Sequence, residues 1–192
     1  MSDEAKSGNA GLTHHSPLTT RDFYERLGLP RRFLVDAGEL ERAYIALSRE
    51  LHPDYHMSGS GEQLEASLEA SAALNEAYNT LRDPFTRAEY LLGLEGGPSA
   101  SEQRQMPGVF LAEMLEAREQ VEQAREKTAD TARLDAEFTK RFDALMQRVA
   151  EIFGNLERSS THASRASALI EIRTLLNAAK YVRGLLRDLH AD

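Results

Sequence analysis

The tripeptide His52-Pro53-Asp54 decides the fold, because it separates two amphipathic segments of the chain. The first segment spans residues 36–51, and the second begins near Gln63. Proline lacks a backbone N–H and disfavours helical geometry at the residue before it, so the first helix must end just before the tripeptide. The turn therefore presents a histidine, a rigid proline and a carboxylate at the tip of two helices. Residues displayed in this way commonly contact a partner.

The composition limits the kinds of protein that the chain can be. Its 192 residues suffice for one domain or two small ones. A formal net charge of −8 argues against nonspecific nucleic-acid binding, which needs a basic surface. The absence of cysteine excludes disulfides, thiolate catalysis and cysteine zinc sites. No apolar run approaches the roughly 20 residues that span a bilayer, and residues 1–16 lack the apolar stretch of a secretory signal. We therefore expect a cytoplasmic protein that binds neither nucleic acid nor membrane.

Capping signals predict four helices in the first half of the chain. They begin near Thr19 or Thr20, at Asp36, near Ser60 and at Asp83-Pro84, and they end at Gly28, Leu51, Arg82 and Gly93. The two long helices are joined by a short loop and should pack antiparallel. The apolar residues expected along the third helix are Leu64, Leu68, Leu74, Tyr78 and Leu81.

The second half of the chain predicts a separate bundle. Residues 94–107 shift to Gly, Pro, Ser, Glu and Gln, a composition typical of a domain boundary. Amphipathic helices are expected from about 108 to 127, from 130 to 156 and from 161 to 189. The middle helix has the most regular apolar stripe: Leu134, Phe138, Phe142, Leu145, Val149, Ile152 and Leu156. No strand pattern occurs, so we predict an all-α protein with a tail at 1–17, a helical domain at 18–94, a linker at 95–107 and a three-helix bundle at 108–192.

The first four helices resemble a J-domain. Further support comes from Asp22-Phe23-Tyr24 with Leu27-Gly28-Leu29, and from Asn75-Glu76-Ala77-Tyr78 with Leu81. The resemblance implies that His52, Pro53 and Asp54 stimulate ATP hydrolysis by a DnaK-type chaperone, with the Asp54 carboxylate accepting an arginine. The alternative is that Asp54 only caps a turn.

Charge on the helix before the tripeptide departs from the pattern of many J-domains, which dock through a basic face. Four arginines and four acidic residues within 31–51 cancel to zero. Steering of the chaperone must therefore come from how the arginines cluster. We expect Arg42 and Arg49, together with His52, to contact the chaperone.

A longer signature narrows the resemblance to the HscB family of co-chaperones for iron–sulfur cluster assembly. It comprises Arg87-Ala88-Glu89-Tyr90-Leu91-Leu92, Val109-Phe110-Leu111 and Leu115-Glu116-Ala117-Arg118-Glu119. The family joins a J-domain to a three-helix bundle that binds the cluster scaffold protein. The resemblance thus implies two partners, a DnaK/HscA-type chaperone ATPase and an IscU-type iron–sulfur scaffold protein, and no cofactor.

Helical spacing places two stripes side by side at the start of the bundle. The first is Phe110, Met114, Ala117 and Val121, and the second is Leu111, Leu115, Glu119 and Glu122. If the first faces the bundle, the second exposes two leucines beside carboxylates, which suits a protein partner. The resemblance places scaffold contacts on Leu111, Ala112, Leu115, Glu116, Glu119, Asn177 and Tyr181. The alternative is that Leu111 and Leu115 belong to the core, since a wide helix face can bury both stripes.

Other classes of function have less support. An enzyme would need a constellation that the sequence lacks, such as a glycine-rich phosphate loop, a Ser/His/Asp set or the Glu-x-x-His metal motif of helical bundles. No metal site is expected. Two alternatives stay open: a J-domain co-chaperone with a different client, and a purely structural helical adaptor in which the tripeptide is incidental.

Overall fold

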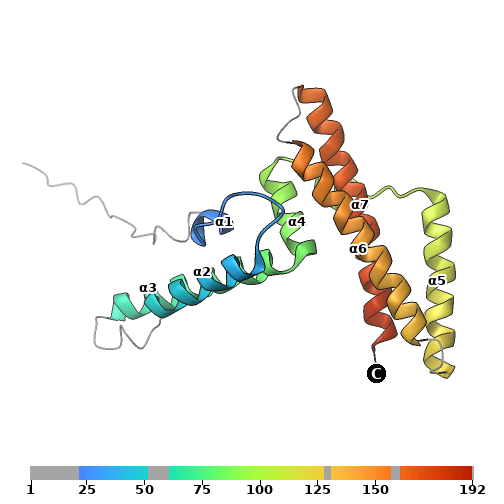
Figure 1. Ribbon diagram of the computed structural model, residues 1–192, viewed down its shortest axis with the longest axis horizontal. Helices are drawn as coiled ribbons and strands as arrows, with labels where there is room; N and C mark the ends of the chain where they lie inside the picture. Colours follow the sequence, from blue (N-terminus) through green and yellow to red (C-terminus); the bar gives the residue numbers. More distant parts are fainter. Residues whose placement is uncertain (1–21, 52–60, 128–130, 157–160, 192) are drawn as a thin grey trace, which may run out of the picture.

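The computed structural model describes residues 22–51, 61–127, 131–156 and 161–191. Within these ranges the chain forms helices and no strand, which confirms the all-α prediction (Figure 1). In chain order they are α1 (Phe23–Arg26), α2 (Ala37–Glu50), α3 (Gly61–Arg82), α4 (Pro84–Leu94), α5 (Gly108–Lys127), α6 (Thr131–Leu156) and α7 (His162–Leu189).

The first helix begins later than its capping signal predicted. Thr19 and Thr20 lie outside the described residues, and α1 begins at Phe23 with Asp22 as its N-cap. The Asp22 carboxylate accepts the backbone N–H of Glu25 at 2.9 Å and also pairs with Arg31. Burial alone would raise the pKa of Asp22, but the Glu25 N–H and the Arg31 guanidinium hold it below its usual value. The acidic residue is therefore the cap and not, as expected, the third residue of a capping box.

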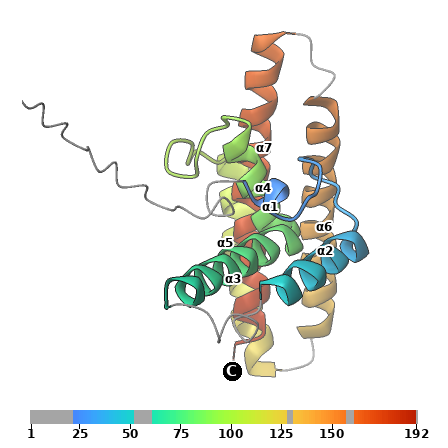
Figure 2. The same ribbon diagram turned by 90° about the vertical axis from the view of Figure 1, so that its left-hand side faces the viewer.

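Helices α2 and α3 form an antiparallel hairpin (Figures 1 and 2). Tyr44 stacks on Tyr78 at 4.1 Å between ring centroids and donates a hydrogen bond to Asn75 at 2.8 Å. Tyr78 donates to Glu41 of α2, and this hydrogen bond raises the pKa of Tyr78. Aromatic rings and polar side chains on both helices thus join their facing surfaces.

The apolar stripe expected on α3 is correct at its C-terminal end and wrong at Leu68, whose side chain is 52% exposed. Ser67 and Ala70 are buried in its place. The stripe rotates because small residues occupy the face on which the helices approach, and Leu74 and Leu81 continue that face. Small side chains allow closer approach than a leucine would, so size rather than hydropathy decides which residues are inside.

The end of α4 also differs from the prediction. Asp83 is the N-cap, accepting the Thr86 N–H at 2.8 Å, and Pro84 opens the helix as expected. The helix does not close at Gly93 but continues to Leu94, and the left-handed conformation (φ 75°) falls on Gly96. Only glycine adopts that conformation without strain, so Gly96 rather than Gly93 turns the chain into the linker.

Helices α5, α6 and α7 form the bundle (Figure 1). Met114 and Val121 of α5 pack against Leu134 and Phe138 of α6 and against Val182 of α7. The stripe predicted for α6 is rotated at its centre. Met146 and Phe153 are buried, whereas Phe142 and Leu145 are only half-buried.

The two halves of the molecule share one hydrophobic core, because α4 packs on α6 and α7 (Figure 2). A row of contacts crosses the junction. Arg87 of α4 donates to the carbonyl of Leu81 at 2.8 Å and lies 5.2 Å from the ring centroid of Phe33. Phe33 in turn stacks on Phe153 of α6 at 5.5 Å. The helical hairpin is therefore anchored to the bundle by side chains from three different elements.

An ion pair is buried at this junction. Arg173 of α7, 1% exposed, donates two hydrogen bonds of 2.5 Å to the carboxylate of Glu89 on α4. Its Nε donates to Asn177 at 3.1 Å, so the guanidinium contacts both halves of the molecule. Bidentate pairs of this kind fix relative orientation as well as distance.

We predict that Glu89→Ala lowers the free energy of unfolding by about 3 kcal/mol, because it leaves the buried Arg173 guanidinium without its carboxylate partner. Urea denaturation of both single variants and of Arg173→Ala/Glu89→Ala measures the coupling. Arg165→Ala serves as the control, since its pair with Glu95 is more exposed and should contribute less than about 1 kcal/mol. Additive costs of the two single changes would contradict the prediction.

Candidate functional site

The tripeptide His52, Pro53 and Asp54 lies outside the described residues, but the point where the chain enters it is described. The backbone carbonyl of Leu51 accepts hydrogen bonds from Ser67 at 2.8 Å and from Ser71 at 2.9 Å. Both serines belong to α3, four residues apart on one face. The residue immediately before His52 is therefore tied to the opposite helix of the hairpin.

The two arginines expected to contact the chaperone are both exposed on α2. Arg42 and Arg49 are seven residues apart, which places them on the same face of the helix. Neither forms an ion pair with any residue in the described ranges. Their guanidinium groups thus remain available to a partner on the helix that leads into the tripeptide.

We predict that Ser67→Ala/Ser71→Ala lowers the free energy of unfolding by about 2 kcal/mol, because the Leu51 carbonyl then has no hydrogen-bond donor in a part-buried site. Chemical denaturation measures the change. Ser164→Ala, in an exposed position on α7, is the matched control and should cost well under that amount. Equal stability of the double variant and wild type would show that water replaces the two hydroxyls.

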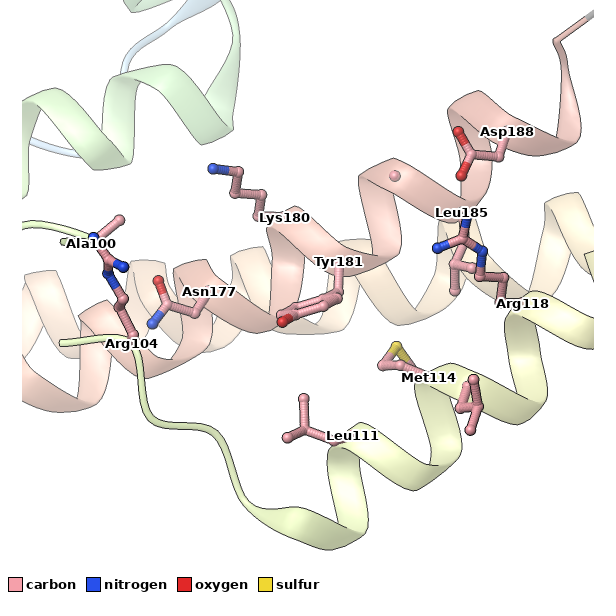
Figure 3. Close-up of a pocket in the computed structure, with 12 residues that line it drawn as sticks. Ala100, Arg104, Leu111, Met114, Arg118, Asn177, Lys180, Tyr181, Leu185 and Asp188 are labelled. Atoms are coloured by element: carbon pink, nitrogen blue, oxygen red, sulfur yellow. The ribbon is translucent and has the colours of Figure 1, made fainter.

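A groove of about 590 Å³ lies between α5 and α7, with the linker at one end (Figure 3). Apolar side chains form most of its surface. Tyr181 of α7 stands at the centre and packs edge-on against Phe110, with ring centroids 5.8 Å apart. The residues that line the groove are Ala100, Arg104, Leu111, Met114, Leu115, Arg118, Asn177, Lys180, Tyr181, Gly184, Leu185 and Asp188.

The first stripe of α5 faces the bundle and the second faces solvent, which is one of the two arrangements that the sequence left open. Met114, Ala117 and Val121 are buried against the bundle. Leu111 is 42% exposed and Leu115 is 62% exposed, so the leucines stand at the surface and are not core residues. Exposed leucines side by side are unusual on a soluble helix unless another molecule covers them.

Four of the seven residues predicted to contact the scaffold meet in the groove: Leu111, Leu115, Asn177 and Tyr181. Ala112, Glu116 and Glu119 are exposed on α5 but do not line it. Asn177 is 8% exposed, and its Nδ2 donates to the Gln103 carbonyl at 2.7 Å. Asn177 therefore forms a wall that holds the linker, while Tyr181, 49% exposed, supplies the aromatic surface.

Sequence reasoning missed the other lining residues. Those on α7 were detectable, because Lys180, Gly184 and Asp188 follow Asn177 and Tyr181 at steps of three and four. Arg104 was not detectable, since nothing in the linker sequence indicates that this residue lies at the groove. The hydrogen bond from Asn177 to the carbonyl of Gln103 holds the neighbouring residue against α7.

Other kinds of site have no counterpart in the described ranges. No group of three or more His, Asp or Glu side chains there is arranged to hold a metal ion. No helix in the described part of the chain is long and apolar enough to cross a membrane. Among the described residues, the groove is the surface that brings together several residues predicted to bind a partner.

Two family models match the chain. Residues 22–90 match the DnaJ domain, and residues 106–190 match the HSCB C-terminal oligomerisation domain. The first match and the helical hairpin define a J-domain protein. Its second domain narrows the class, because the bundle with its α5–α7 groove is the part that matches the HscB model.

Solved structures share the whole arrangement. The chaperone HscB from Vibrio cholerae is 28% identical, with a TM-score of 0.69, covering 88% of this chain and 95% of that one. Human co-chaperone protein HscB is 25% identical, with a TM-score of 0.75, covering 88% of this chain and 81% of that one. The chain belongs to the HscB family, and it is an HscB-type J-domain co-chaperone of iron–sulfur cluster assembly.

Proposed function

We propose that the protein stimulates the ATPase of a DnaK/HscA-type chaperone through His52, Pro53 and Asp54 and delivers an IscU-type iron–sulfur scaffold protein to it. ATP hydrolysis then closes the chaperone on the scaffold and promotes cluster transfer. The observation that carries the proposal is the pair of exposed leucines, Leu111 and Leu115, in a groove of the domain that matches the HscB family. The cytoplasmic location expected from the sequence stays a prediction.

The two partners would be held at separate surfaces. The hairpin tip and the Arg42/Arg49 face belong to α2 and α3, whereas the groove belongs to α5, α7 and the linker. The shared core and the Arg173–Glu89 pair join the two parts. A rigid connection would let one surface present the scaffold while the other acts on the ATPase.

The groove suits a protein surface better than a small substrate. Its apolar centre consists of Leu111, Leu115 and Tyr181, each more than two-fifths exposed. Covering such side chains removes apolar surface from water and contributes about 25 cal/mol per Å². Aromatic and large aliphatic residues at the centre with charged residues at the rim are typical of protein interfaces.

The hairpin tip is tested by Asp54→Ala, which should abolish stimulation of a DnaK-type ATPase because the carboxylate that accepts a chaperone arginine is lost. Steady-state ATP hydrolysis measures the effect, and circular dichroism confirms that the variant folds. Asp143→Ala, an exposed carboxylate on α6, is the control and should stimulate normally. Unchanged stimulation by Asp54→Ala would contradict the role of this carboxylate, and no stimulation by the wild-type protein would favour a structural adaptor.

The groove is tested by Leu111→Ala/Leu115→Ala, which should weaken binding of an IscU-type scaffold by about a hundredfold, because two anchoring side chains are truncated. Isothermal titration calorimetry gives the dissociation constant. Leu68→Ala, which truncates a similarly exposed leucine on α3, is the control and should bind as wild type does. Normal binding by the double variant would point to a different client or a different surface.

A synergistic effect of the scaffold and this protein on the chaperone ATPase would distinguish delivery of the scaffold to the chaperone from two unrelated binding activities. Scaffold added to the wild-type protein should raise chaperone ATPase stimulation above the sum of the separate effects. The Leu111→Ala/Leu115→Ala protein should retain its own stimulation and lose the synergy, since its hairpin tip is unaltered.

A further inference from the structure

The groove is not symmetric in charge along its length. Arg104 lies at the linker end, and Lys180 extends from the rim of α7 toward that end (Figure 3). Arg118 and Asp188 lie at the other end, beside Leu185. The linker end therefore has two cations, while the other end is lined by one cation and one carboxylate.

The positive charge at the linker end is not compensated within the described residues. Neither Arg104 nor Lys180 forms an ion pair with any of them, although Arg118 lies 3.7 Å from Glu122. Glu102 of the linker accepts the backbone N–H of Ser99 at 2.7 Å, so its carboxylate is engaged there. Arg104 and Lys180, like Arg42 and Arg49 on α2, therefore remain available to a partner.

The position of Arg104 is set by the fold. Asn177 donates to the carbonyl of Gln103, the residue immediately before Arg104, and its Oδ1 accepts from Arg173. Arg173 is itself paired with Glu89. A chain of hydrogen bonds from the domain junction thus holds the linker against α7 and brings Arg104 to the end of the groove.

We infer that the linker end of the groove binds a carboxylate of the docked scaffold protein, and that Arg104 and Lys180 determine which way round the scaffold lies. This inference rests on the proposed function of the groove. Apolar contacts with Leu111, Leu115 and Tyr181 supply affinity but no direction, since an apolar floor accepts a segment in either orientation. An acidic group next to the apolar segment, placed between Arg104 and Lys180, selects one orientation.

A protein carboxylate fits the site better than a free anion. Both cations are exposed, and exposed lysine or arginine binds small anions weakly because water competes. A partner that already covers the apolar floor excludes that water and strengthens the ion pairs. The net charge of −8 also opposes binding of nucleic acid, because the phosphates are negatively charged too.

Charge reversal tests the inference. Arg104→Glu and Lys180→Glu should each weaken binding of an IscU-type scaffold about threefold, and together about tenfold, because each change replaces an attraction with a repulsion. Calorimetry in low and in high salt should show the difference shrinking as salt is added. Lys140→Glu, the same change on α6 outside the groove, is the matched control and should bind like wild type.

The outcomes separate this inference from the proposal on which it rests. If wild type binds and Leu111→Ala/Leu115→Ala does not, yet Arg104→Glu/Lys180→Glu equals Lys140→Glu, only the inference is overturned. If wild type does not bind the scaffold, both fall. Displacement of the scaffold by inorganic phosphate at constant ionic strength would reveal a free-anion site and would also overturn the inference.

Discussion

The buried pair between Arg173 and Glu89 is the contact on which the arrangement of the molecule depends. A guanidinium that is 1% exposed has no water to replace a lost partner, so the carboxylate of α4 must stay where α7 places it. Apolar contacts in the shared core supply attraction but tolerate sliding. The bidentate geometry of the pair removes that freedom, which sets the orientation of the J-domain on the bundle.

The same arginine links the junction to the groove. Its Nε reaches Asn177, whose other polar atom holds the linker. An apolar residue at position 177 would add apolar surface to the groove but would leave the Gln103 carbonyl without this donor. Asn177 therefore fixes one wall of the groove but contributes less apolar surface than a large apolar residue would.

Much of the fold followed from local rules in the sequence. Caps at Asp36 and Asp83 predicted the starts of α2 and α4, and the regular spacing of apolar residues predicted α7 closely. Errors arose where tertiary packing decides. Leu68 is exposed because Ser67 and Ala70 permit the closer approach of α2, and Met146 rather than Leu145 is buried in the core that α6 shares with α4 and α7.

The sequence also predicted one part of the groove and missed another. Helical periodicity separated the exposed leucines of α5 from its buried face, and the family resemblance indicated why they matter. Arg104 and the wall formed by Asn177 depend on a hydrogen bond between residues 74 positions apart, which no local pattern encodes. Likewise the two serine hydroxyls on the Leu51 carbonyl need the hairpin to be formed before they meet it.

The linker between the J-domain and the bundle also lines the groove, and this limits the insertions that it can accept. Segments between domains usually accept inserted residues, because they only span a gap. Here the segment that follows Gly97 also lines one end of the groove, so an insertion between Gln103 and Arg104 would displace Arg104 from it. Such a change in spacing would therefore alter the surface at which we propose that a partner binds.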